Sequence, residues 1–344
     1  MGREPLLQRF ASRHPIWTLL VAIVVAGLLW LIFAPWSDGL EDAIGKKKVF
    51  LNAVFGGVTL GALYFLVAAG FTLIFGLMRN VNLAHGSLYL LGGYLGFEVS
   101  EATGSWLLAF PVVFVVVAIL GLLLQHVVFR RMEGQELRQT MVTIGLSVVL
   151  ADIMLWIWGG QSYTILTPDL LSGPVELPVI SSIRADTGDV IWFKFPAVRI
   201  AILIAAIVIG VAMWLVLNRS RLGMLIRAGV DDREMLAASG VRIQYVFLAV
   251  FAFGAGLAGI GGIVGGTFQS LTPGEDTRFL LASLVVVIVG GMGSIPGAAL
   301  GAVIIGLAEQ LGLVYAPTYS VVFTFLIMAV VLAFRPQGLL GAGR

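Results

Sequence analysis

Long apolar stretches alternate with short polar ones along almost the whole chain. The apolar runs lie at 16–34, 49–78, 84–100, 107–129, 140–158, 197–217, 244–270, 279–293, 297–314 and 318–334. A helix of about 20 apolar residues crosses the hydrocarbon core of a bilayer, and most of these runs approach or exceed that length. The pattern therefore predicts an all-α polytopic membrane protein with about ten transmembrane helices, or about eight at the fewest.

Three runs need separate interpretation. As one helix, run 49–78 would measure about 45 Å, so it must tilt, break or project into water. Run 279–293 would measure about 22 Å, so it is either a short crossing or a re-entrant element that moves the C-terminus outside. Run 16–34 is longer than the core of a signal peptide and has no small-residue cleavage site, which predicts a retained first helix.

The basic residues predict the orientation. If the N-terminus is cytoplasmic and every run crosses, most of the 21 Lys and Arg residues fall in cytoplasmic segments, as the positive-inside rule requires. Both chain ends are then cytoplasmic. The basic residues left outside are Lys46 to Lys48, Arg184, Lys194, Arg199 and Arg278.

The composition agrees with a membrane protein and limits the chemistry. With 59% hydrophobic residues, 12% charged residues and a mean hydropathy of +1.01, the chain cannot form a soluble globule with a polar surface. Cysteine is absent, which excludes disulfides and thiolate metal sites. The 43 glycines include GxxxG spacings that predict close helix packing, at Gly57/Gly61, Gly92/Gly96, Gly261/Gly265 and Gly297/Gly301.

No sequence motif indicates catalysis, a cofactor or a metal site. GAGLAG at 254–259 lies inside an apolar run rather than after a strand, so it predicts helix packing rather than nucleotide binding. The segment Gly45 to Lys47 lacks the glycine spacing and the Ser or Thr of a Walker A motif. We expect no enzyme activity and no nucleic-acid partner, and any ATP that drives this protein must bind another chain.

Ionisable residues within apolar runs are candidate functional residues, because a charge in hydrocarbon costs about 2.5 to 3.5 kcal/mol. Asp152 either pairs with another helix or lines a translocation pathway. Glu309 lies toward the outer end of its run and can reach the interface.

Asn82, His85 and Gly86 lie where one apolar run ends and the next begins. One interpretation is a cytoplasmic turn. The other is a broken helix, whose free backbone groups would face protein or a water-filled path. In that case the amides of a half-helix would point at an anionic group such as a substrate carboxylate. These three residues and Asp152 are therefore the candidates for the translocation pathway.

The polar segment 219–242 separates two long apolar runs on the predicted cytoplasmic side. Asp231 and Glu234 form a capping-box-like pair, from which a short helix continues to Ser239, and Gly240 suits its end. A helical piece before them also has an apolar face. Two such helices are suited to a groove on a partner protein, and anchoring to the membrane surface by the arginines is the alternative.

The largest segment on the predicted outer side, 159–196, carries four acidic residues and three prolines before its last position. This composition predicts an irregular surface loop that is too small for a separate domain. The loop is either a docking surface for an external partner or a connector.

Four blocks of the chain, from about residue 50 onward, resemble the Liv-type membrane subunit of the branched-chain amino-acid ABC importers and follow that family's order. The blocks are GLMRNVNLAHGSLYLLGGYLG, RSRLGMLIRAGVDDREMLAASGV, GGMGSIPGAALGAVIIGLAE and FRPQGLLG. The resemblance implies a type II-like import permease in a bacterial-type inner membrane. Its implied partners are two cytoplasmic ATPase subunits, a second similar permease in a heterodimer, and an extracytoplasmic binding protein.

The resemblance also implies a division of the chain. Residues 1–48 would hold a cytoplasmic N-terminus, an extra first helix and an outer loop, and residues 49–344 the permease core with a coupling loop at 218–243. The Asn-x-Ala-His-Gly segment at 82–86 would lie along the translocation route. The residues expected to couple to the ATPase are Arg227, Ala228, Asp231, Glu234, Ala237 and Gly240.

The expected function is thus ATP-driven import of branched-chain or related hydrophobic amino acids. Urea, short amides and other small solutes are alternative substrates, because permeases of this family type also move them. A secondary transporter or channel that works alone, with Asp152 carrying coupling ions, is an alternative from another class. The second to fifth and the seventh to tenth predicted spans run in opposite senses, which suggests the hypothesis of an inverted repeat.

Overall fold

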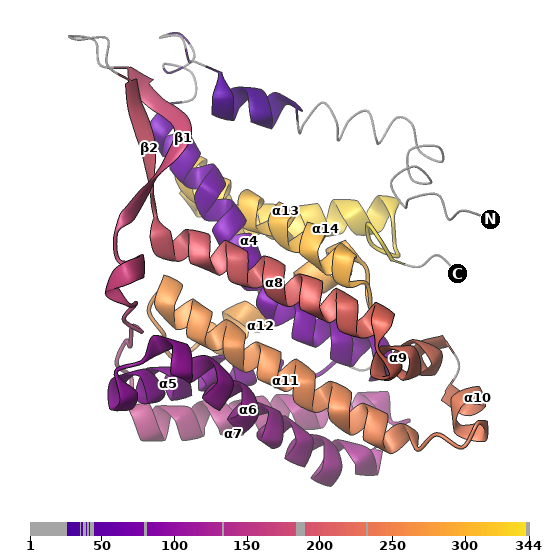
Figure 1. Cartoon of the computed structure of the whole chain (residues 1–344). Coiled ribbons are helices and arrows are strands. Elements are labelled where there is room, and N and C mark those ends of the chain that lie inside the picture. The colour runs from indigo at the N-terminus through magenta and orange to yellow at the C-terminus, as the bar shows by residue number, and fades with distance from the viewer. Residues whose placement is uncertain are drawn as a thin grey trace. The chain divides into compact units, whose positions relative to one another are not determined.

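The structure is a computed structural model of the chain (Figure 1). It describes residues 26–34, 36, 39, 41, 45–78, 81–132, 134–183, 190–231 and 233–341. The chain divides into two units. The first combines Met1–Asn52 with Pro174–Phe195, and the second combines Ala53–Gly173 with Pro196–Arg344.

Most described residues are helical. The α-helices are α4 (Lys47–Met78), α5 (His85–Thr103), α6 (Trp106–Val127), α7 (Glu136–Trp158), α8 (Ala197–Arg219), α9 (Arg221–Asp231), α10 (Arg233–Ala238), α11 (Ile243–Phe268), α12 (Glu275–Gly290), α13 (Ile295–Tyr315) and α14 (Ser320–Phe334). Single 3-10 turns are η1 (Phe129–Met132), η2 (Asp169–Leu171) and η3 (Pro317–Tyr319).

Seven helical segments among the described residues are long and apolar enough to cross a membrane. Predicted runs 84–100 and 279–293 form α5 and α12, which are helices but do not belong to these seven. Helix α12 has 16 residues and measures about 24 Å. Run 16–34 lies mostly outside the described residues. A mostly helical multi-pass protein is confirmed, while the count of about ten spans and the inverted repeat stay predictions.

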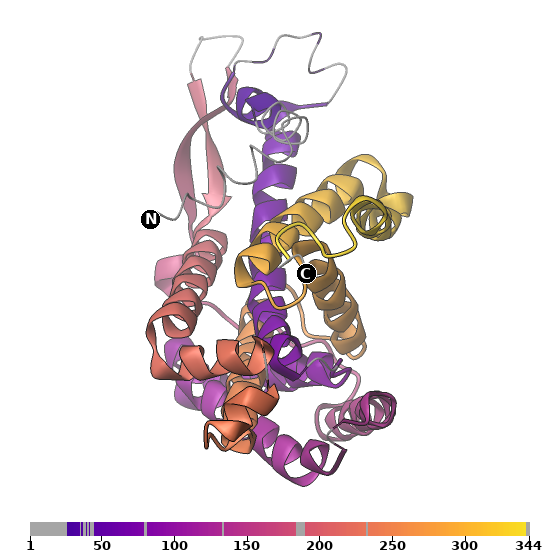
Figure 2. The ribbon, with the colours of Figure 1, turned by 90° about the vertical axis from the view of Figure 1, so that its right-hand side faces the viewer.

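Run 49–78 forms a single helix, α4, of 32 residues. No proline interrupts this helix, and its length is about 48 Å. Of the three predicted possibilities, a break is therefore excluded, and α4 must tilt or project beyond a core of about 30 Å. Figure 2 shows α4 as one continuous element.

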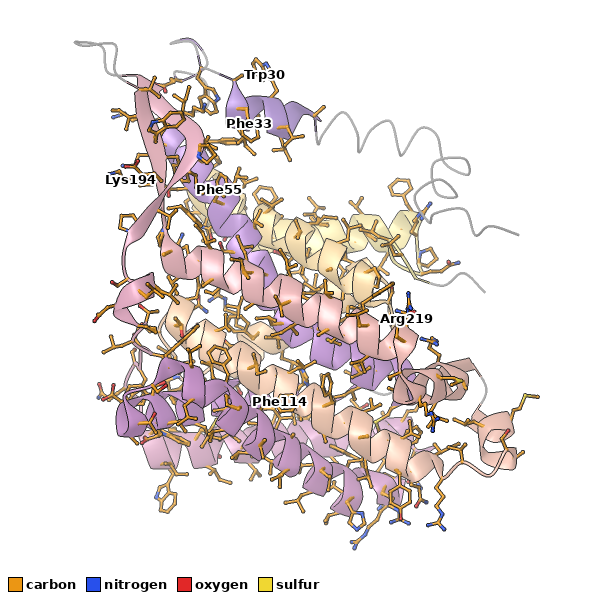
Figure 3. The ribbon with its side chains drawn as sticks, viewed as in Figure 1. Trp30, Phe33, Phe55, Phe114, Lys194 and Arg219 are labelled. Atoms are coloured by element: carbon orange, nitrogen blue, oxygen red, sulfur yellow. The ribbon has the colours of Figure 1, made fainter. Side chains whose placement is uncertain are left out.

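The predicted irregular loop at 159–196 is wrong in part, because it contains a β-hairpin in the first unit. Strand β1 (Pro174–Ile183) pairs with β2 (Val190–Pro196). In β2 the aromatic and β-branched side chains favour a strand, and Phe193 and Phe195 alternate with exposed residues. Lys194, labelled in Figure 3, lies on the exposed face and pairs with Glu176 of β1 at 3.1 Å.

The core of the second unit forms around α11, which packs along α5 and α6 (Figure 1). Glycines permit this close approach. A Cβ at Gly262 of α11 would overlap the backbone of Tyr89 on α5, and one at Gly92 would overlap Gly259. Within GAGLAG, a Cβ at Gly256 would lie 2.7 Å from the ring of Phe114 on α6. The prediction that GAGLAG serves helix packing is therefore confirmed.

A second glycine crossing joins α4 to α13. A Cβ at Gly61 would lie 2.7 Å from the carbonyl oxygen of Ala302, and one at Gly57 would lie 2.8 Å from the Cα of Leu307. On α13 itself, Gly301 approaches the α12 backbone in the same way, with Val286 as the nearest residue. The predicted GxxxG spacings thus mark real helix crossings.

We expect Gly262→Ala to destabilise the protein because its methyl group has no room against Tyr89 and Gly93. Overpacking of this kind costs about 1 to 3 kcal/mol and should lower the melting temperature of the purified protein. Gly145→Ala on α7 is the matched control, since a Cβ there meets nothing within 4 Å. Equal melting temperatures for the two variants would contradict the crossing.

Candidate functional site

The described part of the connection between α4 and α5, residues 81–84, is a turn in which Asn82 and Ala84 are buried. The backbone N–H of Ala84 donates to the Asn82 side-chain oxygen at 3.1 Å, and that of His85 donates to the Asn82 carbonyl at 3.2 Å. From α7, the hydroxyl oxygen of Thr143 accepts the N–H of Leu83 at 3.2 Å. Asn82 is only 5% exposed. The turn is therefore ordered by its own asparagine and by a neighbouring helix.

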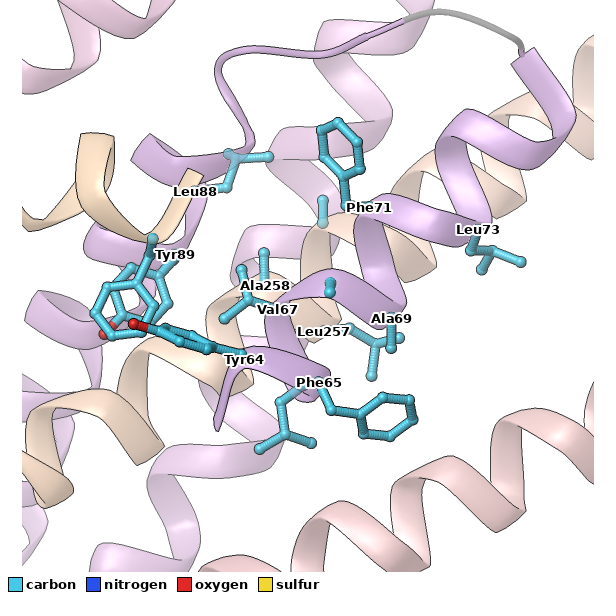
Figure 4. Packing of buried hydrophobic residues seen from close by; sticks show 14 of the residues in the cluster. Tyr64, Phe65, Val67, Ala69, Phe71, Leu73, Leu88, Tyr89, Leu257 and Ala258 are labelled. Atoms are coloured by element: carbon cyan, nitrogen blue, oxygen red, sulfur yellow. The ribbon is translucent and has the colours of Figure 1, made fainter. Parts of the chain in front are cut away.

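His85 places the start of α5 beside the middle of α4. Its fully buried ring approaches the Val67 carbonyl through Nε2 at 3.0 Å, and its edge meets Phe71 at a centroid distance of 5.4 Å. Val67 and Phe71 lie on one stretch of α4 in Figure 4. Val67 precedes Met78, the end of α4, by about three turns or ~16 Å. The chain therefore folds back along α4 before α5 begins, which favours the broken-helix interpretation over a turn at the helix end.

Gly86 lies against the first turn of α12. A Cβ at Gly86 would overlap the carbonyl oxygen of Asp276 and would lie 2.8 Å from the Cβ of Leu280. The next residue, Ser87, makes a long hydrogen bond of 3.5 Å from its hydroxyl to the Asp276 carboxylate. The N-terminal turns of α5 and α12 thus meet inside the bundle, and only a residue without a side chain fits at their contact.

Two buried polar atoms in this region have no hydrogen-bond partner among the described residues. They are Nδ1 of His85 and the side-chain nitrogen of Asn82. Because a carbonyl only accepts, the bond to Val67 requires a proton on Nε2. In the neutral imidazole with this proton, Nδ1 is an acceptor. Buried polar atoms are normally paired, so these two sites can each bind a water molecule or a polar solute.

Asp152 is not brought to this region. Its side chain is exposed on α7, and no ion pair to it occurs in the described part of the chain. Of the four predicted pathway residues, Asn82, His85 and Gly86 therefore lie together, and Asp152 lies apart from them.

The structure contains a charged cluster on α4, α12 and α13 that the sequence did not predict. The guanidinium of Arg278 pairs with Glu275 at 3.3 Å and with Glu309 at 3.1 Å. The other carboxylate oxygen of Glu309 accepts the Tyr64 hydroxyl at 2.6 Å. Glu309 does not simply reach an interface, because its side chain is 12% exposed and has two partners. Arg278 and Glu309 are 31 positions apart in the sequence, so no local pattern predicted that they pair. The only signal in the sequence was their apolar surroundings.

Aromatic rings form one wall of the cluster. Phe279 stacks on Tyr89 with centroids 4.2 Å apart, and it meets the edge of Tyr64 at 5.7 Å. The Arg278 guanidinium carbon lies 5.7 Å from the centre of the same Phe279 ring. Figure 4 shows Tyr64 and Tyr89 within the buried packing. The cluster therefore combines a cation, carboxylates and a flat apolar surface.

The polar segment 219–242 forms α9 and α10, as two short helices were predicted. The predicted start of the second helix is corrected, because Asp231 ends α9 and α10 begins at Arg233. Gly240 has a φ of +82°, which suits the predicted helix stop. The side chains of Asp231, Glu234 and Ala237 lie outside the described part.

Helix α9 is attached to the bundle by one face. Ile226 is 5% exposed and lines an apolar pocket with Leu73 of α4, Met213 of α8 and Val250 of α11. Arg227 donates to the carbonyl of Leu217 in the last turn of α8. Ala228 is half-buried. On the exposed faces, Met224 of α9 and Met235 of α10 are 57% and 69% exposed.

The apolar helices, the buried polar turn and the polar segment 219–242 define a multi-pass membrane protein with the features of a transporter. Residues 53–332 match the model of the family described as branched-chain amino acid transport system / permease component. Because this match covers most of the sequence, the chain belongs to that family. The resemblance found in the four sequence blocks is thereby confirmed.

Individual relatives agree with the family. The high-affinity branched-chain amino acid transport system permease protein LivH of Escherichia coli (strain K12) is 30% identical over 307 residues, which cover 85% of this chain and 96% of that protein. BraD of Pseudomonas aeruginosa, which has the same description, is 29% identical over 304 residues with the same coverage. LivM of E. coli is 26% identical over 341 residues, which cover 93% of this chain and 74% of that protein. No solved structure matches the chain.

We expect His85→Leu to destabilise the start of α5 because it removes the hydrogen bond to Val67 from a fully buried position. The expected loss is about 1 to 3 kcal/mol, measured as a lower melting temperature of the purified protein. His85→Gln, which keeps a donor near the Nε2 position, should recover part of that loss. If both variants have the wild-type melting temperature, the hydrogen bond to Val67 does not stabilise the start of α5.

Proposed function

We propose that this chain is the membrane-spanning permease subunit of an ATP-driven importer for branched-chain or related hydrophobic amino acids. The family match over residues 53–332 carries this proposal, and the printed descriptions of LivH and BraD supply the substrate class. The chain itself performs no chemistry. It forms the route, and separate cytoplasmic ATPase subunits bind and hydrolyse ATP.

The route passes the buried turn between α4 and α5. Asn82 lies beside the last turns of α4, His85 reaches Val67 in the interior of α4, and Gly86 lies against α12. Irregular backbone among membrane helices is tolerated only beside protein or a watery path. The unpaired side-chain atoms of Asn82 and His85 support this assignment, since each can bind a polar group that passes.

A second, similar permease completes the route in a heterodimer, and an extracytoplasmic binding protein delivers the solute. The similarity of this chain to both LivH and LivM supports a pair of related subunits. Asp152 supports the same arrangement, because an exposed carboxylate within the apolar helix α7 would cost about 2.5 to 3.5 kcal/mol against lipid. We assign Asp152 to the surface that the second permease covers, where it borders the translocation pathway.

Helices α9 and α10 couple the ATPases to the bundle, with both chain ends on the cytoplasmic side of the cell membrane. The exposed residues Met224 and Met235 suit an apolar groove on the ATPase, and the buried Ile226 connects α9 to α4, α8 and α11. The residues proposed to carry the coupling are Arg227, Ala228, Asp231, Glu234, Ala237 and Gly240.

The proposal predicts that uptake requires the ATPases. Vesicles that contain this chain with a second permease, two ATPase subunits and a binding protein should accumulate radiolabelled L-leucine when ATP is supplied to the ATPase side. Vesicles with this chain alone should not. Uptake by the chain alone, without ATP, would instead identify a secondary transporter. Urea and short amides serve as competing solutes, and stronger competition by either than by L-isoleucine would reassign the substrate.

We expect Ile226→Ala to uncouple the importer, because it removes the side chain that seats α9 in the bundle. ATP hydrolysis should continue while leucine uptake falls at least about fivefold, within the range of typical coupling free energies. Ile207→Ala is a matched control, since Ile207 on α8 is 65% exposed. Unchanged uptake per ATP hydrolysed in Ile226→Ala would contradict the coupling role of α9.

A further inference from the structure

The charged cluster of Arg278, Glu275, Glu309 and Tyr64 contains more negative than positive charge. Two carboxylates share the one guanidinium, at 3.3 and 3.1 Å. Asp276 follows Glu275 directly and is itself buried, at 7% exposed. A surplus of carboxylates among apolar helices is costly unless further positive charge arrives. The cluster is therefore suited to a ligand that brings a cation.

The cation of the cluster is the more accessible partner. The Arg278 side chain is 40% exposed, whereas those of Glu275 and Glu309 are 20% and 12% exposed. An incoming solute thus meets the guanidinium first. Guanidinium groups bind carboxylates through paired hydrogen bonds, so the first group recognised is an anion of planar, two-oxygen shape.

The two carboxylates are held in place by other groups than Arg278. Tyr64 from α4 donates to Glu309 at 2.6 Å, and the amide of Gln269 donates to Glu275 at 3.3 Å. If Arg278 moves to bind a ligand, both carboxylates keep a hydrogen bond and a fixed position. A second charged group of the ligand can then replace the guanidinium beside them.

The position of the cluster connects it to the proposed route. Arg278 lies in the first turn of α12, and Asp276 of the same turn contacts Gly86 and Ser87 at the start of α5. The fully buried ring of Phe279 lies beside Arg278 and stacks on Tyr89, so the first turn of α12 is anchored to α5. The charged cluster and the turn before α5 are therefore connected by one short helical segment.

We propose that this cluster is a binding subsite for the charged end of a zwitterionic amino acid. Arg278 binds the α-carboxylate, and Glu309 and Glu275 bind the α-ammonium group. The inference deepens the proposed function and rests on it. In the empty subsite Arg278 pairs with both glutamates. When the solute binds, its carboxylate pairs with Arg278 and its ammonium group pairs with the glutamates, and the net charge of the cluster does not change.

The absence of cysteine from the chain permits a direct test by a single introduced thiol. Thr272→Cys places it beside Glu275, whose backbone N–H donates to the Thr272 carbonyl at 3.2 Å, and its modification by a charged methanethiosulfonate reagent is followed in the assembled permease and ATPase complex. L-leucine at about ten times its dissociation constant leaves about one site in eleven free, so modification should slow about tenfold. At the same concentration, 3-methylbutylamine and 4-methylpentanoate, which each lack one charged group, should not slow it.

Arg278→Gln in the thiol background should abolish protection by L-leucine, while Arg138→Gln, a matched change at an exposed position on α7, should preserve it. The exchanged pair Arg278→Glu with Glu309→Arg keeps an ion pair between α12 and α13 and so separates recognition from folding. It should keep the wild-type melting temperature but lose protection. Protection that survives in the Arg278→Gln or the exchanged variant would overturn the proposal, as would equal protection by the amine or the acid.

The outcomes also separate this subsite from the transport function. ATP-dependent leucine uptake without any protection of the thiol would overturn the subsite and leave the importer intact. Protection by leucine without ATP-dependent uptake would support the subsite and overturn the proposed function.

Discussion

The structure depends on backbone-to-backbone contact between helices at glycines. In a bilayer, moving apolar side chains from lipid into contact with each other gains little free energy, because lipid is equally apolar. Helices therefore associate through close packing of their backbones. Helix α11 makes such contacts with α4 through Gly254 and Gly70, and with α5 through Gly259 and Gly92. Each contact would be lost with a single methyl group. The positions of these glycines therefore determine how α4, α5 and α11 pack together.

This close packing makes the buried turn before α5 possible. Gly70 of α4 leaves room for the His85 ring, whose Cε1 lies 3.3 Å from the position that a Cβ would take. Gly86 does the same for the first turn of α12. Because α4 and α12 both approach this closely, protein covers the backbone groups at the start of α5. Irregular backbone inside a membrane requires such cover. The polar turn and the glycine crossings are thus parts of one packing solution.

The sequence predicted the local features of this structure better than the long-range ones. The glycine spacings predicted helix crossings and the polar segment 219–242 predicted two short helices, because each of these patterns is contained within a few residues. The hairpin was not predicted, because nearby proline and acidic residues indicated an irregular loop. They outweighed the strand signal of Trp192 to Phe195, where exposed and buried side chains alternate. The pairing of Arg278 with Glu309 could not be predicted, because it depends on how α12 and α13 face each other rather than on any local pattern.

The polar segment 219–242 and the turn before α5 contact the same helix, α4. Ile226 of α9 lines a pocket with Leu73 of α4, and His85 contacts Val67 about one and a half turns further along, or ~9 Å. Both contacts lie on one unbroken helix, so a displacement of α9 need not pass through a flexible connection to reach the start of α5. A rigid element shared by two sites is the simplest physical carrier of coupling between them. The continuity of α4 therefore provides a mechanical link between the segment 219–242 and the turn before α5.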